Sequence, residues 1–148
     1  MASSSVSAET IQGRWKLTAA EDLRADGSVA RYPWGEHPVG WIVVDGGFLY
    51  LQIMSADVPS FAAGKPIGEQ MAATALSSYI SYSGPVTIDE AAGKVSFKPQ
   101  AAWRPDYLGS TQERNFRFEG GKMYFGLPLG GGRGGESLTR RLTLVRVP

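Results

Sequence analysis

The chain has 148 residues, with 15 basic and 14 acidic side chains, one histidine and no cysteine. The net charge of +1 gives no field for holding phosphates, which argues against nucleic-acid binding. No apolar run approaches the roughly 18 residues of a membrane span, and without cysteine there are no disulfides, thiolate nucleophiles or cysteine-ligated metals. Residues 1–8 show no secretory signal. We therefore expect a cytoplasmic protein with no nucleic-acid or membrane partner.

The length predicts one domain, at residues 11–148, preceded by a flexible segment at residues 1–10. Apolar and polar residues alternate over 14–21, which is typical of a half-buried strand. The sequence Asp45-Gly46-Gly47 separates two apolar runs and predicts a hairpin, because glycine tolerates a positive φ. Further predicted strands are 39–44, 48–54, 78–89, 94–98, 112–119, 122–127 and 138–147.

Eight strands at hairpin spacing indicate an all-β fold, an eight-stranded antiparallel up-and-down β-barrel with one or two short helices. Residues 67–78, after Pro66, are predicted to be helical, and residues 8–12 could form one turn. The strands 39–44 and 48–54 are apolar on both faces. This favours a barrel over a sandwich, with the helix across an opening or on the outer wall.

Several spaced motifs resemble a known family. Gly13-Arg14-Trp15 resembles the Gly-x-Trp signature of lipocalin and other calycin barrels, in which the tryptophan closes the narrow end under a basic residue of the last strand, matched here by Arg146. Stretches at 32–40, 80–84, 86–90 and 105–109, followed by Gln112 and Arg114, are similar to a family of small stand-alone lipocalin-like domains. These motifs cover most of residues 11–148.

The resemblance implies a lipocalin-like barrel around a ligand cup. Members of this group include proteins of natural-product pathways that cyclise or isomerise a small molecule without a cofactor. The chain departs from the family where such domains carry histidines, at residues 95–98, and where they carry an aromatic before the final arginine, at Leu144-Val145. The roles of those residues therefore do not transfer.

Large side chains on the predicted strands are candidates for the barrel interior. They either line a ligand cavity or fill the interior, and Trp103, in the long connection at 99–105, is a candidate to cap the cavity. The predicted ligand-binding residues are Trp41, Tyr50, Gln52, Met54, Phe97, Trp103, Tyr107, Phe116, Met123 and Phe125.

Three residues are candidates for catalysis. Arg114 shares a strand face with Phe116 and Phe118, so its cation needs a carboxylate such as Asp106 or Glu113, solvent, or an enolate or carboxylate of a ligand. Tyr82 would act as an acid if a nearby cation lowered its pKa. His37, the single histidine, lies in a proline-flanked loop where it is either exposed or catalytic.

The resemblance, together with these residues, implies a cofactor-independent cyclase or isomerase of a small, largely apolar secondary metabolite, without a metal. The alternatives are a non-catalytic carrier of an apolar or aromatic molecule and a structural barrel with a filled interior. Trp103 is also a candidate for a homodimer contact. The glycine-rich stretch at 130–135 lacks the ending of a phosphate-binding loop and is predicted as a flexible hairpin loop.

Overall fold

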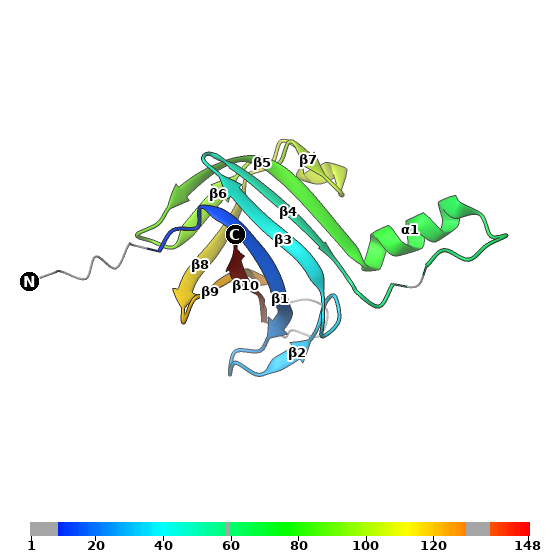
Figure 1. Cartoon of the computed structure of the whole chain (residues 1–148), viewed down its shortest axis with the longest axis horizontal. Coiled ribbons are helices and arrows are strands. Elements are labelled where there is room, and N and C mark those ends of the chain that lie inside the picture. The colour runs from blue at the N-terminus through cyan, green and yellow to red at the C-terminus, as the bar shows by residue number, and fades with distance from the viewer. Residues whose placement is uncertain (1–8, 59, 130–136) are drawn as a thin grey trace, which may run out of the picture.

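The structure is a computed structural model that describes residues 9–58, 60–129 and 137–148 (Figure 1). Its barrel strands are β1 (Gly13–Leu23), β3 (Val39–Asp45), β4 (Phe48–Met54), β5 (Tyr79–Asp89), β6 (Lys94–Phe97), β8 (Gln112–Glu119), β9 (Lys122–Leu129) and β10 (Leu138–Val147). Each pairs antiparallel with the next, and β10 pairs with β1, which closes the barrel. Short strands β2 (Val29–Arg31) and β7 (Ala101–Ala102) flank β1 and β5. The predicted eight-stranded up-and-down barrel is confirmed.

Glycine turns set the register of the sheet. Gly46 has a φ of +59° between β3 and β4, and Gly120 and Gly121 have φ of +59° and +80° between β8 and β9. A positive φ at both turn residues, as at Gly120-Gly121, or at the first one, as at Gly46, gives a turn whose twist matches that of antiparallel strands. In the β3–β4 hairpin Ile42 opposes Leu51, and both side chains are buried. The turn thus decides which face of each strand meets the core.

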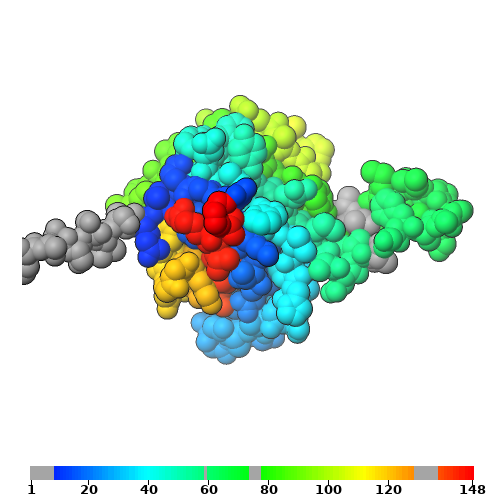
Figure 2. All heavy atoms as spheres, in the orientation of Figure 1, coloured from blue at the N-terminus to red at the C-terminus, as the bar shows by residue number. Residues whose placement is uncertain are grey.

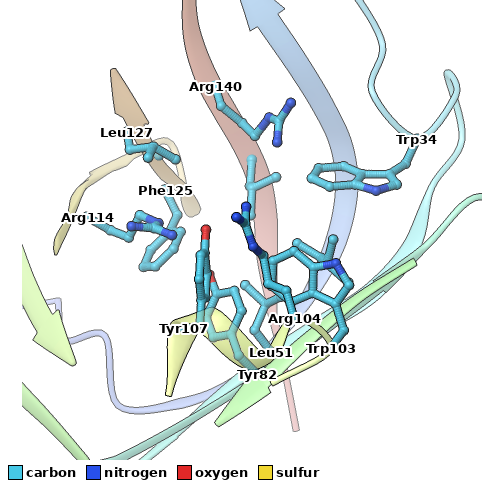
Figure 3. A pocket seen from close by; sticks show the side chains of 13 residues that line it. Trp34, Leu51, Tyr82, Trp103, Arg104, Tyr107, Arg114, Phe125, Leu127 and Arg140 are labelled. Atoms are coloured by element: carbon cyan, nitrogen blue, oxygen red, sulfur yellow. The ribbon is translucent and has the colours of Figure 1, made fainter. Parts of the chain in front are cut away.

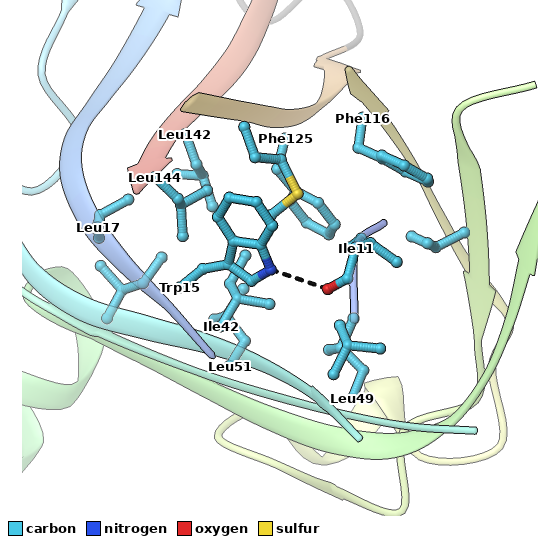
Figure 4. Packing of buried hydrophobic residues seen from close by; sticks show 14 of the residues in the cluster. Ile11, Trp15, Leu17, Ile42, Leu49, Leu51, Phe116, Phe125, Leu142 and Leu144 are labelled. Carbon is cyan, nitrogen blue, oxygen red and sulfur yellow. Dashed lines mark hydrogen bonds between the residues drawn. The ribbon is translucent and has the colours of Figure 1, made fainter. Parts of the chain in front are cut away.

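Trp15 closes one end of the barrel (Figure 4). Its indole Nε1 donates a hydrogen bond to the carbonyl oxygen of Ile11 at 2.9 Å. The Arg146 guanidinium lies 4.3 Å from the centroid of the indole ring, so the predicted stacking of Arg146 on Trp15 is confirmed. Buried side chains from six strands pack around the tryptophan and fill this end: Leu17, Ile42, Leu49, Leu51, Phe116, Met123, Phe125, Leu142 and Leu144.

Helix α1 (Ile67–Ser77) forms where it was predicted, but it does not cover the barrel wall. Figures 1 and 2 show it standing away from the body of the barrel, and the side chains of Ile67 and Met71 are exposed. The expectation of a helix across an opening of the barrel or on its outer wall is therefore wrong, and no helix covers the outer faces of β3 and β4 in the described residues. Those faces meet solvent instead.

Other predictions concern the ends and loops of the chain. The predicted helical turn at 8–12 is wrong as far as the structure describes it, because residues 9–12 are not helical. The glycine-rich stretch 130–135 and residues 1–8 lie outside the described residues. A one-turn 3-10 helix, η1 (Pro105–Tyr107), follows β7. No helix in the described ranges combines the length and apolar character that a membrane crossing requires.

Candidate functional site

A cup of about 140 Å³ lies at the end of the barrel opposite Trp15 (Figure 3). Strand β10 links the two ends, because Arg140 and Leu142 near its start line the cup whereas Arg146 near its end covers Trp15. The floor and walls are mostly aromatic and aliphatic, with three arginines. The lining residues are Trp34, Leu51, Ile80, Tyr82, Trp103, Arg104, Tyr107, Arg114, Phe125, Gly126, Leu127, Arg140 and Leu142.

The connection after β6 folds back along β5 and places Trp103 over the cup. The amide of Trp103 donates to the carbonyl oxygen of Ser81 at 2.8 Å, and Ala102 pairs with Tyr82. This close approach requires glycine at position 84, since a Cβ there would lie 2.1 Å from the carbonyl oxygen of Lys98. Helix η1 then turns the chain so that Tyr107 also reaches the cup.

Three aromatic rings, of Tyr82, Trp103 and Tyr107, form one continuous side of the cup, and Phe97 packs behind Tyr82. The rings of Tyr82 and Phe97 stack with centroids 5.0 Å apart and an interplanar angle of 12°. The Trp103 ring lies 6.0 Å from Tyr82 and meets Tyr107 edge to face at 5.1 Å. Offset and edge-to-face pairs of this kind suit the quadrupoles of aromatic rings. The wall can therefore hold a flat apolar ring.

Arg140 is neutralised from outside the cup by Asp22. Its Nε and Nη2 donate to Oδ1 and Oδ2 of Asp22 at 2.9 and 3.1 Å, and Arg31 adds a bond of 2.6 Å to the same carboxylate. Burial by itself raises the pKa of Asp22, but the hydrogen bonds and charges of Arg140 and Arg31 outweigh it and hold that pKa below its ordinary value. The Arg140 guanidinium also lies 4.8 Å from the Trp34 ring centroid.

Arg104 is neutralised at the rim. Its Nε and Nη2 donate to Oδ1 and Oδ2 of Asp106 at 2.8 and 2.6 Å, and its guanidinium lies 4.9 Å from the ring centroid of Tyr107. Both charged side chains are more than half exposed. Water screens such a pair, so it orients the rim more than it stabilises the fold.

Arg114 differs from the other two arginines of the cup. Its residue is 6% exposed, and its Nη1 donates to the carbonyl oxygen of Glu113 at 2.8 Å and, weakly, to Oε1 of Gln112 at 3.5 Å. The guanidinium also lies 5.3 Å from the ring centroid of Phe97. Within the part of the chain that the structure describes, Arg114 forms no ion pair. The predicted alternative of a pair with Asp106 or Glu113 is wrong, because Asp106 binds Arg104 and Glu113 supplies only its carbonyl.

Tyr82 keeps its proton at ordinary pH. Burial raises the pKa of its hydroxyl to about 12, although the nearby charge of Arg114 acts in the opposite direction. The expectation that a cation lowers this pKa is wrong in its net effect, because the loss of hydration is larger. Tyr82 can therefore donate a hydrogen bond to a ligand but is not a base.

The cup brings together five of the predicted site residues: Arg114, Tyr82, Trp103, Tyr107 and Phe125. Phe97 packs behind Tyr82, and Phe116 and Met123 belong to the buried core rather than to the wall of the cup. His37 is exposed in the loop between β2 and β3 and does not line the cup. The placement of Phe97, Phe116, Met123 and His37 against a ligand is therefore not supported.

The predicted lumen positions on β3 and β4 are wrong. Trp41, Tyr50, Gln52 and Met54 are exposed on the outer face, where the Gln52 amide donates to the Tyr79 hydroxyl at 3.0 Å. The physical reason is the register, since Leu51 and not Tyr50 pairs with the inward-facing Tyr82. The barrel interior takes the aliphatic side chains of these two strands and leaves the larger ones outside.

Sequence reasoning missed Trp34, Arg104 and Arg140 as lining residues. Trp34 is buried in the loop before β3, and only its long-range contact with Arg140 brings it to the cup. Arg104 arrives through the fold-back after β6. Of these three, only Arg140 could have been predicted from the sequence, because it is two residues from Leu142 and therefore lies on the same inner face of β10.

The wall of the cup opens between β8 and β9. Their ladder ends at Asn115 and Gly126, beyond which β8 continues to pair with β6 and β9 with β10. A groove of about 410 Å³ lies over this gap on the outside of the barrel. Arg114 and Leu127 line both this groove and the cup, so Arg114 stands at a side opening.

No group of three or more His, Cys, Asp or Glu side chains gathers as metal ligands in the residues that the structure describes. The chemistry of the cup rests on arginine cations, tyrosine hydroxyls and an apolar wall. A closed barrel with such a cup defines a protein that fits the binding of one small molecule.

The comparison of the sequence with protein families agrees with this class. The profile of the Lipocalin-like domain matches residues 12–137, which is most of the chain, and the protein belongs to this family. No curated protein and no solved structure matches the chain significantly. The predicted family is thus confirmed.

Proposed function

We propose that the protein binds a small, largely apolar ring compound in the cup and isomerises or cyclises it without a cofactor. The observation that supports this most is the convergence of Arg114 and the Tyr82 hydroxyl on one aromatic wall (Figure 3). Both groups can donate hydrogen bonds to a ligand, and the raised pKa of Tyr82 keeps its hydroxyl protonated near neutral pH. They suit a reaction in which negative charge develops on an oxygen of the substrate.

The contribution of each part follows from its chemistry. The rings of Tyr82, Trp103 and Tyr107 orient a flat substrate and keep water from it, which lowers the entropic cost of reaching a reactive shape. The Arg114 cation and the Tyr82 hydroxyl stabilise the negative charge that develops on a substrate oxygen while bonds rearrange within the substrate, a step in which no proton has to leave it. Loss of one such donor costs about 10²- to 10³-fold in rate.

A carrier function is the second candidate. The described lining residues include neither a carboxylate nor a histidine, and Tyr82 holds its proton, so the wall offers no obvious base. A protein that only saturates with its ligand needs none. Turnover separates the two candidates, because an enzyme converts many equivalents of substrate and a carrier retains one.

The proposed homodimer would use a different surface. Val39, Trp41, Tyr50 and Met54 are exposed on the outer face of β3 and β4. A second copy packed there would bury these side chains and would leave the cup free. Trp103, the earlier candidate for this contact, lies instead at the cup.

The test uses a metabolite extract and a catalytic amount of the protein. Mass spectrometry after chromatography follows pairs of compounds with equal mass. We expect one isomer to fall as its partner rises over many turnovers, and Arg114→Met to slow this by about 10²- to 10³-fold. Arg117→Met, on the outer face of β8, is the matched control and should leave the rate unchanged. Retention of one compound at a 1:1 ratio without conversion would establish the carrier instead.

A further inference from the structure

The cup carries an unbalanced positive charge. Its described lining contains three arginines, Arg104, Arg114 and Arg140, and neither an aspartate nor a glutamate. The counter-ions of two of them lie off the wall: Asp22 holds Arg140 and Asp106 holds Arg104. Only Arg114 faces the cup without a carboxylate among the described residues.

Burial makes this imbalance significant. An exposed arginine needs no partner, because water solvates it. Arg114 is 94% buried, and among the described residues its partners are neutral: the carbonyl oxygen of Glu113 at 2.8 Å, Oε1 of Gln112 at 3.5 Å and the Tyr82 hydroxyl, although a guanidinium has five N–H donors. A buried cation in this state is costly, and a carboxylate that accepts two parallel hydrogen bonds is its best geometric match.

The size of the cup limits the rest of the ligand. A cavity of about 140 Å³ is close to the roughly 150 Å³ apolar cavity in another protein that accepts benzene. The aromatic wall of Tyr82, Trp103 and Tyr107 suits the face or edge of one ring. The volume and the wall together indicate a single ring.

We propose that the ligand is a carboxylic acid that bears one flat ring, bound as the anion with its carboxylate on Arg114 and its ring against Trp103 and Tyr107. This assignment rests on the proposed function of the cup and names its substrate class: the carboxylate takes two of the five N–H donors of Arg114, and the remaining donors can reach the oxygen on which charge develops. The carboxylate lies at the side opening between β8 and β9, while the ring lies in the apolar part of the cup.

The test compares benzoate with benzamide, which has nearly the same shape and no charge. Binding is followed by the fluorescence of Trp34 and Trp103, which line the cup, and by the shift in melting temperature. We expect benzoate to bind at least tenfold more tightly than benzamide to the wild-type protein. Arg114→Met should abolish this preference, Arg114→Lys should keep part of it, and Arg117→Met should keep all of it.

The possible results have distinct meanings. Equal binding of benzoate and benzamide would overturn the anionic ligand but leave the proposed function intact. Binding of neither would overturn both, because the cup would then not accept even one ring. A preference for benzoate that survives in Arg114→Met would overturn the role of Arg114. If Arg114→Met fails to fold, the ratio of benzoate to benzamide affinity in the wild-type protein and in Arg114→Lys still tests the proposal.

Discussion

Asp22 and Arg140 face each other across β1 and β10 and form a two-point ion pair, with N–O distances of 2.9 and 3.1 Å, in which the carboxylate is fully buried. This pair joins the first and last strands at the rim of the cup. It therefore adds a side-chain link to the backbone ladder that closes the barrel, and it holds the Arg140 cation beside Trp34. Loss of this ion pair should lower the free energy of unfolding and change how that free energy depends on pH.

Asp22→Asn should lower the free energy of unfolding by about 3 kcal/mol, because it leaves Arg140 and Arg31 without their shared anion. The folded-state pKa of Asp22 lies below its ordinary value, so the wild-type carboxylate stabilises the fold above that ordinary value and loses this contribution as the pH falls through the lowered one. Urea unfolding at several acidic pH values should show a shallower pH dependence for Asp22→Asn than for wild type. Asp106→Asn, at an exposed ion pair that water screens, is the control and should change stability and its pH dependence much less than Asp22→Asn does.

The buried hydroxyl of Tyr82 should make the fold less stable at alkaline pH. Because the pKa of Tyr82 is raised to about 12 in the folded state, the hydroxyl ionises first in unfolded chains, and the fold is destabilised as the pH rises from about 10 to about 12. Tyr82→Phe should remove this part of the decline in stability. Tyr50→Phe, at an exposed tyrosine, should not. Equal alkaline unfolding of both variants and wild type would contradict the burial of this hydroxyl.

Arg114→Met should not weaken the empty protein. Exchange of a buried cation that lacks a carboxylate for an apolar side chain of similar length is expected to be neutral or stabilising, by up to about 2 kcal/mol. Urea unfolding without ligand measures this. A loss of more than about 1 kcal/mol would show that Arg114 is structural, whereas an unchanged or higher stability would show that the arginine is kept at a cost for its ligand.

Gly126→Ala should disrupt the cup. A Cβ at this position would lie 1.9 Å from the carbonyl oxygen of Arg140, so β9 and β10 must separate beside the wall. We expect a loss of more than about 2 kcal/mol of stability and a loss of benzoate binding. Gly68→Ala is the control, because a Cβ there meets nothing within 4 Å on helix α1. It should raise stability slightly, by at most about 1 kcal/mol.

Arg146→Ala should weaken the closed end of the barrel and spare the cup. The Arg146 guanidinium covers Trp15 and donates to the carbonyl oxygens of Gln12 and Thr10, so its removal should cost about 1–2 kcal/mol. Benzoate affinity should stay within twofold of wild type. A large loss of affinity would mean that the two ends of the barrel are coupled through the core.

The sequence predicted the barrel because its signals are local. Glycine turns such as Gly120-Gly121 lie between alternating strands, and hairpins between neighbours in the chain leave few topologies other than an up-and-down ring. Arg146 could be assigned to Trp15 because the first and last strands meet when such a ring closes. The bounds of helix α1 followed from Pro66 and from local helix propensity.

The wall of the cup was only half predictable. Alternation places Arg114 inside, because β8 has a polar and an apolar face. It gives no direction on β3 and β4, where Trp41 and Ile42 are both apolar and only the pairing of Leu51 with Tyr82 decides. Long-range packing brings Trp34 and Arg104 to the cup, and no spacing within the sequence contains that information.

The β8–β9 ladder ends early, at Asn115 and Gly126, and this would let related proteins evolve to bind larger ligands. At the β4–β5 and β9–β10 seams beside the cup, a bulky substituent would have to break backbone hydrogen bonds in order to pass through the wall. Beside Arg114, β8 and β9 do not pair with each other. An acid with a long tail can therefore keep its headgroup on the same arginine while the tail extends along the outer groove, and mutations at Leu127 and Pro128 would tune that tail without touching the core.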